Sequence, residues 1–365
     1  MQFFRFLKNE ITLVPFLKSF KNYRWDFFKK DFFASLSIAL LAIPQSIAYS
    51  LLAGLPPTAG LFSAIFGTVF TSLMGSSKHL VSGPTTAVSI LIQTVTAQIL
   101  LEFYPTLTGD EKTAVTLQIL MHIVLVIGIT QILFALLNMG KLLQFVSRSV
   151  ILGYLTGVVI AIVVNQLYYV FGLPSSEEEG ILIYRFKELI LSAANIRLMP
   201  FFIAVLSFVF LAFFKKRSKI LPYPLLMIIL TSLIVFLFNQ WTPFSVSTLN
   251  TMNLPSVFSL QLIFPSFSIT LFQRVFFAAL AISLLALLEV FSVSRAVSAK
   301  TGHDIKTNQE VFAVGISNFI LGFIKGAMPA SGSLSRSLLN IESKGKTRIA
   351  PLLSGGFVAF LAFFA

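Results

Sequence analysis

Long apolar stretches repeat along the chain, and they constrain its fold more than any other feature. A helix needs about 20 mostly apolar residues to cross the hydrocarbon core of a bilayer. The candidate spans are 31–53, 57–74, 85–101, 114–138, 143–171, 198–214, 222–240, 270–294, 308–324, 333–342 and 350–365. Of the 365 residues, 56% are apolar and 11% are charged, which is too little charge to cover a soluble domain. We therefore expect an all-α polytopic membrane protein, because helices satisfy their own backbone groups in lipid.

Two of these spans, 85–101 and 333–342, are short for a full crossing, and each follows a stretch with glycine and serine. The stretches are Val81-Ser82-Gly83-Pro84 and Ala330-Ser331-Gly332-Ser333. A helix that begins at mid-membrane presents free N–H groups and the positive end of its dipole, and both favour an anion. Two such ends facing each other, one from each half of an inverted repeat, are typical of a known class of transporter. The repeated Ser-Gly pair is a faint sign of such internal symmetry.

The formal net charge of +13 is distributed as a signal of membrane topology. Most basic residues lie in short connections between apolar runs, which argues against a nucleic-acid partner. If the N-terminus is inside and every span changes sides, 20 of the 27 basic residues fall on the inner side, counting Arg148 near the inner end of 143–171, and five fall outside. The outside connections also carry Asp110-Glu111 and Glu177-Glu178-Glu179. We expect a multi-pass protein of the inner (plasma) membrane with a cytoplasmic N-terminus.

The two ends of the chain lead to further expectations about its organisation. Residues 1–30 hold seven basic residues among aromatics and lack a signal-peptide cleavage site. We expect this segment to be cytoplasmic and amphipathic, lying on anionic lipid, with a transmembrane domain over 31–365. Because the chain stops at Ala365 inside an apolar run, we also expect it to be part of a longer protein.

Several chemistries find no support in the sequence. There is no cysteine, so disulfides and cysteine-ligated metals are excluded, and three scattered histidines make a histidine metal site a poor expectation. No phosphate-binding loop is complete, and no nucleophile–base arrangement or carboxylate pair can be assembled from the intramembrane residues. We expect no cofactor and no enzymatic activity.

Two ionisable residues within the spans, Glu289 and Arg336, stand out as candidates for function. Charged groups at membrane depth are costly and usually functional. Glu289 could instead be a structural carboxylate hydrogen-bonded between helices. Arg336 could instead be an interfacial cation whose side chain reaches the membrane surface, although four hydroxyl residues surround it.

Uncharged polar residues accompany these two charges. Hydroxyl groups gather at the starts of the two short segments, at Thr85, Thr86, Ser331, Ser333 and Ser335. In the first span, Pro44 interrupts the helix and frees a backbone carbonyl, while Gln45 brings an amide to membrane depth. Tyr49 lies four residues later, on the same helix face as Gln45. A proline kink and simple packing are the structural alternatives for these residues.

Four motifs follow one another in order along the chain. The most specific is Ala42-Ile43-Pro44-Gln45-Ser46-Ile47-Ala48-Tyr49 through Pro57, followed by Gly60-Leu61-Phe62-Ser63. The others are His79-Leu80-Val81-Ser82-Gly83-Pro84, then Thr307-Asn308-Gln309-Glu310, then Pro329 through Ser337 with Asn340. With these motifs the chain resembles the SulP family of sulfate permeases and related anion transporters. The resemblance extends from about Asp31 to the end of the chain.

The resemblance implies a fourteen-helix fold of two inverted seven-helix repeats, with half-helices preceded by short strands and a core domain moving against a gate domain. It also implies that about eleven helices are present here, that the last three and a cytoplasmic STAS domain would follow, and that a homodimer could form. The anion would lie between the third and tenth helices, lined by Gln45, Tyr49, Thr85, Ser335 and Arg336. The family often has an apolar or aromatic residue where Thr85 stands, so pocket polarity would differ here.

Glu289 matches an acidic position in the eighth helix of this family. In sodium-coupled bicarbonate members this residue is Asp, with a Thr four residues later. Here the residues are Glu289 and Val293, which favours proton coupling or exchange over sodium.

We therefore expect a secondary active anion transporter, with sulfate favoured, that works by proton symport or anion exchange through an elevator-type movement of the core. The alternatives within the family are bicarbonate and dicarboxylate transport. A proton-coupled nucleobase symporter of the same fold is a further alternative, although Arg336 and the hydroxyls suit an anion better. An uncoupled anion channel or a membrane scaffold would be a different class.

Overall fold

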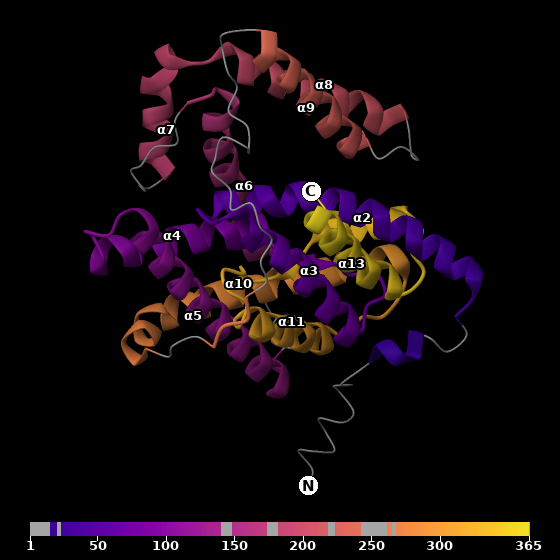
Figure 1. Cartoon of the computed structure of the whole chain (residues 1–365). Coiled ribbons are helices and arrows are strands. Elements are labelled where there is room, and N and C mark those ends of the chain that lie inside the picture. Colours follow the sequence, from indigo (N-terminus) through magenta and orange to yellow (C-terminus); the bar gives the residue numbers. More distant parts are fainter. Residues whose placement is uncertain are drawn as a thin grey trace. The chain divides into compact units, whose positions relative to one another are not determined.

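The computed structural model describes residues 15–19, 23–139, 148–173, 182–217, 223–241, 261–264 and 268–364 (Figure 1). Within these ranges a short 3-10 helix, η1 (Pro15–Ser19), precedes the first long helix, and another, η3 (Ser192–Asn195), follows α7. The α-helices are α2 (Trp25–Leu52), α3 (Pro57–Met74), α4 (Thr86–Phe103), α5 (Gly109–Leu136), α6 (Arg148–Val170), α7 (Leu182–Leu191), α8 (Leu198–Arg217), α9 (Tyr223–Trp241), α10 (Ile269–Thr301), α11 (Thr307–Leu321), α12 (Leu334–Glu342) and α13 (Ile349–Phe364).

Each of the eleven predicted spans is confirmed as a helix over its described residues, with ends that differ by up to seven residues; residues 143–147, 222 and 365 of these spans lie outside the described part of the chain. Five described helices, α2, α3, α4, α5 and α10, are long and apolar enough to cross a membrane. Three details of the prediction were wrong. Helix α4 has 18 residues, about 27 Å at 1.5 Å per residue, and is not short for a crossing, whereas α12 has only nine. Helix α2 continues through Pro44 without interruption. Helix α7 was not predicted, because its apolar residues alternate with charged ones.

The described residues form two compact units, one over 1–147 and 256–365 and the other over 148–255. The second unit contains α6 to α9. In it, Tyr168, Leu173 and Leu189 form a buried cluster, and the Tyr168 hydroxyl donates to Glu188 at 3.4 Å. The amphipathic helix α7 therefore packs against the end of α6. The expected acidic cluster at 177–179 and most of the N-terminal segment 1–30 lie outside the described residues.

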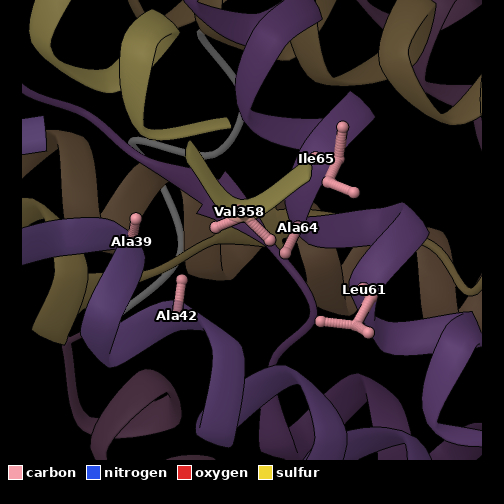
Figure 2. Packing of buried hydrophobic residues seen from close by; sticks show 6 residues of the cluster. All are labelled: Ala39, Ala42, Leu61, Ala64, Ile65 and Val358. Carbon is pink, nitrogen blue, oxygen red and sulfur yellow. The ribbon is translucent and has the colours of Figure 1, made fainter. Parts of the chain in front are cut away.

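The first unit contains α2 to α5 and α10 to α13. Helix α13, in yellow in Figure 1, lies alongside α2 and α3. Figure 2 shows the buried contact: Val358 of α13 lies between the two alanines of α2 and three residues of α3. The cluster consists of Ala39, Ala42, Leu61, Ala64, Ile65 and Val358. Small residues allow helix axes to approach closely where there is no hydrophobic drive between helices in lipid.

Helices α5 and α11 also pack closely, through glycine and an amide network. A side chain at Gly128 or Gly315 would collide with the backbone of the opposite helix. The Asn318 amide donates to the Gln131 side chain at 2.8 Å and to the Ala330 carbonyl at 3.0 Å, and its oxygen accepts from the Ala330 N–H at 2.7 Å. This network attaches the segment that leads into α12 to the α5–α11 pair.

A two-stranded antiparallel sheet joins the two halves of the first unit. Strand β1 (Ser82–Gly83) pairs with β2 (Ser331–Gly332), in a register that places Ser82 opposite Gly332 and Gly83 opposite Ser331. The Ser-Gly repeat noted in the sequence is therefore a pair of strands related by an approximate twofold rotation. Helices α4 and α12 begin directly after these strands, so their N-termini start from the same place.

Candidate anion-binding site

The N-termini of α4 and α12 form the framework of the site. Thr85 and Ser333 are the residues that precede the two helices, both have extended backbone conformations, and neither caps its helix with its side chain. The Ser333 N–H donates to the Val81 carbonyl at 2.9 Å, and the Val81 N–H donates to the Ser337 hydroxyl at 2.9 Å. The start of α12 is thus held against the residue before β1. The positive ends of two helix dipoles are brought to one place, which favours an anion.

Arg336 supplies a full positive charge at this place. Its side chain is completely buried, and its Nη2 donates to the Pro84 carbonyl at 2.9 Å. Its Nε and Nη1 have no hydrogen-bond partner, and no described carboxylate forms an ion pair with it. A buried cation without a counter-charge is costly unless something neutralises it. The guanidinium therefore has donors available for an anion. Its complete burial argues against the alternative that its side chain extends to the membrane surface.

Gly83 of β1 lets the guanidinium lie close to the strand. A Cβ atom at Gly83 would lie 2.7 Å from Nη1 and 2.9 Å from Nη2 of Arg336, closer than real Cβ contacts. We expect Gly83→Ala to displace the guanidinium and to weaken anion binding by about tenfold, the effect of losing one hydrogen bond to a charged group. Titration of purified protein with sulfate would measure this.

The control is Gly356→Ala in α13, where an added Cβ meets no atom within 4 Å. It should leave anion affinity unchanged. Equal affinity in the Gly83→Ala variant would show that the position of Arg336 does not depend on this close approach.

Glu289 of α10 contacts the residue that precedes α4. The Thr85 hydroxyl donates to Glu289 Oε2 at 2.8 Å, and the Ser331 hydroxyl also lies beside this carboxylate. Both Thr85 and Glu289 are partly accessible, unlike Arg336. The structure thus places a carboxylate in direct contact with the residue that begins one of the two helices of the site.

Helix α2 contributes the remaining predicted residues. It packs against α4 and α12. Tyr49 lies close enough to Arg336 to interact with it electrostatically. The Gln45 Oε1 atom is buried and has no hydrogen-bond partner. An amide oxygen only accepts hydrogen bonds, so this orphaned atom marks a place where a water molecule would be its donor.

The structure brings some predicted residues together and leaves others apart. Thr85 contacts Glu289, and Ser333 contacts Ser335 at 3.5 Å between hydroxyl oxygens. Ser335 is exposed, and Thr86, at the first position of α4, is partly accessible. Among the described side chains, Thr86, Ser335 and Gln45 form no hydrogen bond with Arg336. They are assigned to the site because the helices that carry them meet there.

The match to known proteins decides the family. The model of the Sulfate permease family matches residues 28–365. The chain belongs to the sulfate permease family. The expectation of a transporter rather than an enzyme agrees with this membership.

The relatives of this sulfate permease family member include sulfate transporters and members of solute carrier family 26. Sulfate transporter 4.1, chloroplastic, of Arabidopsis thaliana is 31% identical over 94% of this chain and 49% of its own length. Solute carrier family 26 member 6 of Homo sapiens is 28% identical over 92% of this chain and 45% of its own length. The chain spans about half the length of the curated relatives that it matches.

A solved structure confirms the predicted fold for this family member. The transmembrane domain of the cyanobacterium bicarbonate transporter BicA matches with a TM-score of 0.78 at 23% identity, over 93% of this chain and 83% of that one. The chain is therefore a multi-pass, all-helical membrane protein with this transporter fold.

The structure also buries charged residues that the sequence did not single out. Asp31 is completely buried and accepts from the Lys346 and Thr347 N–H groups at 2.6 and 3.1 Å and from the Thr347 hydroxyl at 2.6 Å. Glu310 accepts from Ser76 and Ser77, with N–H distances of 2.6 and 2.7 Å. Both residues lie at or near the start of a predicted span, where a charged residue is ordinarily expected to meet water, so their burial was not predicted.

These carboxylates brace the loops at the far end of α3 and α12. Arg348 donates to the Ser76 carbonyl at 2.7 Å. Burial lowers the pKa of His79, so its neutral ring donates from Nε2 to the Gly345 carbonyl at 3.0 Å. The loop after α3 and the loop after α12 are thereby joined, which fixes the two segments that lead to and from the site.

Proposed function

We propose that this chain is the transmembrane part of a secondary active anion transporter, with sulfate as the favoured substrate. Its single strongest support is Arg336, fully buried, without a counter-charge and with two unpaired donor atoms at the meeting point of two helix N-termini. An anion there would receive charge-assisted hydrogen bonds from the guanidinium and from helix N–H groups. Gln45, Tyr49, Thr85, Thr86, Ser333 and Ser335 would complete its surroundings.

An anion fits these groups better than a neutral nucleobase does. A nucleobase site needs acceptors for ring N–H groups, whereas the groups gathered here are mainly donors. Only Glu289 adds an acceptor with a charge, and its carboxylate already accepts from Thr85.

Glu289 is the group that we propose as the coupling residue. A carboxylate at membrane depth, hydrogen-bonded to the start of α4, can take up a proton and so lower its repulsion of a nearby anion. Protonation would then accompany anion entry, which is proton symport. Val293, where a hydroxyl would help to hold sodium, supports a proton as the coupling ion.

The two compact units support an elevator-type movement. Both strands, both helix N-termini, Glu289 and Arg336 belong to the first unit. Movement of that unit as a body would carry the anion without taking the site apart. We propose an inner-membrane location with a cytoplasmic N-terminus, on the distribution of basic residues, and a homodimer on the family resemblance.

Bicarbonate is the second candidate substrate, because one of the solved structures with this fold is that of a bicarbonate transporter. Two features favour sulfate. The relative with 31% identity is a sulfate transporter, and a divalent anion makes better use of a guanidinium together with two helix N-termini. Dicarboxylates share the charge of sulfate but need a longer pocket.

The test is uptake of radiolabelled sulfate into proteoliposomes that contain the full-length protein. We expect an inward proton gradient to accelerate uptake severalfold, because it drives protonation of the coupling carboxylate on the outer side. Empty liposomes give the background. Uptake that requires sodium, or that responds to bicarbonate and not to sulfate, would move the assignment to the second candidate. Single-channel currents would show that the protein is a channel and not a carrier.

A further inference from the structure

Thr85 occupies an unusual position between the coupling carboxylate and the start of α4. As the residue that precedes the helix, a threonine ordinarily turns its hydroxyl toward the N–H groups of the first turn. Here the side chain makes no such bond. Its hydroxyl proton is directed instead at Glu289 Oε2, 2.8 Å away on α10.

A hydroxyl has one proton, so it can donate to one acceptor at a time. While Glu289 is ionised, its carboxylate accepts that proton. Once Glu289 is protonated, the carboxyl group becomes the donor and the Thr85 oxygen becomes the acceptor. The Thr85 proton is then released and can turn toward an anion at the helix N-terminus.

We propose that Thr85 is a positioning residue that relays the protonation state of Glu289 to the bound anion. This inference rests on the proposed function, because the new acceptor of the Thr85 proton would be the anion that the proposed function places in the site. Acidic conditions then raise anion affinity in two ways: they remove a negative charge, and they supply one more hydrogen-bond donor.

Ser331, the other hydroxyl beside Glu289, has a different arrangement. Its hydroxyl donates to the Ala286 carbonyl of α10 at 3.1 Å. When Glu289 is protonated, the Ser331 proton therefore keeps an acceptor inside the protein. Among the described residues, Glu289 is the one acceptor of the Thr85 hydroxyl, and this difference from Ser331 identifies Thr85 as the relay.

No charged side chain in the described part of the chain forms an ion pair or hydrogen bond with Glu289. The helices packed against α10 are α4, α5, α11 and α12. Their ionisable residues, with those of α10 itself, are Glu102, Asp110, Glu111, Lys112, His122, Glu310, Arg336, Glu342, Arg274, Arg295 and Lys300. Of these, Arg336 lies at the proposed anion site, so the anion would screen it from Glu289 when bound.

The experiment measures sulfate affinity of the purified full-length protein from mildly acidic to mildly alkaline pH. Sulfate is the probe because its own charge does not change in this range. In the wild type we expect affinity to rise on acidification. Glu289→Gln should hold affinity at the high, acidic level at every pH, since its amide can donate to the Thr85 oxygen.

Thr85→Val removes the hydroxyl with almost no change of shape. We expect it to reduce the ratio of acidic to alkaline affinity by about tenfold, the value of one hydrogen bond to a charged group. The repulsion between ionised Glu289 and the anion would remain in this variant. Thr85→Ser retains a hydroxyl and should retain the ratio. Thr94→Val, which removes a hydroxyl that bonds to the Ile90 carbonyl within α4, is the matched control and should behave as wild type.

The outcomes separate the relay from the function on which it rests. If Glu289→Gln removes the pH dependence while Thr85→Val keeps the full ratio, the relay is wrong and the two groups communicate by charge alone, with the transporter assignment intact. If the wild type binds sulfate with no pH dependence, or does not bind it, the coupling role of Glu289 fails and the relay fails with it. A thermal unfolding curve like that of wild type shows that each variant is folded.

Discussion

Arg336→Ala is expected to abolish saturable sulfate uptake and to weaken sulfate binding by about 100-fold or more. Removing one partner of a buried charge pair costs about 2–5 kcal/mol, much of it from the partner left unpaired. In the anion complex that partner would be sulfate. Proteoliposome uptake and titration of the purified protein measure the two effects. Arg336→Lys should restore only part of the affinity, because a single ammonium group cannot reproduce the planar fork of donors.

The loss should not come from unfolding. Arg336 has no counter-charge among the described residues, so its removal leaves no orphaned charge, and only the Pro84 carbonyl loses a partner. Arg295→Ala is the control: Arg295 is exposed and lies over the Phe291 ring at 5.2 Å. It should transport normally. Wild-type affinity in Arg336→Ala would remove this residue from the site.

Glu289→Gln is expected to eliminate the stimulation of sulfate uptake by an inward proton gradient while leaving sulfate exchange across the membrane. The amide has nearly the same shape as the carboxyl group and cannot change its charge, so it fixes the state that a proton would produce. Uptake rates with and without the gradient, and exchange of internal for external sulfate, measure the two properties separately.

The matched control for this change is Glu342→Gln. Glu342 lies at the end of α12 and forms an exposed ion pair with Lys300 at 3.0 Å. Exposed pairs contribute little, so this variant should keep both the gradient effect and the exchange. A gradient response that persists in Glu289→Gln would assign proton coupling to another group.

Much of the fold could be predicted because lipid imposes one strong rule on the sequence. A run of apolar residues near 20 long has to be helical in lipid, so the long predicted spans were found, whereas 333–342 was found as a short segment after a glycine and serine stretch. Helix α7 was missed because Leu182–Leu191 is short and carries Arg185, Lys187 and Glu188 among its apolar residues. Nothing in a search for uninterrupted apolar runs detects a helix of that kind.

The sequence predicted which residues belong to the candidate site, but it did not predict how they lie relative to one another. Arg336 and Glu289 stood out because charge is rare within the spans. The contacts of Arg336 depend on the close approach of its guanidinium to Gly83 and on the Pro84 carbonyl, which no periodicity encodes. The burial of Asp31 and Glu310 was missed because both lie near span ends, where charged residues normally meet water. Their partners are backbone N–H groups of loops distant in sequence, such as those of Lys346 and Ser76.

The pairing of β1 with β2 also means that the site can form only late in synthesis, because its two strands are far apart in the sequence. Ser82 leaves the ribosome long before Gly332, its partner in the sheet. During that interval the first strand and the start of α4 have no second half to pair with, and Thr85 has no Glu289. Ribosome-bound chains that stop before residue 331 should therefore insert their early helices yet hold β1 unpaired. Completion of β2 and α12 would then allow the two strands to pair and the two halves of the site to come together.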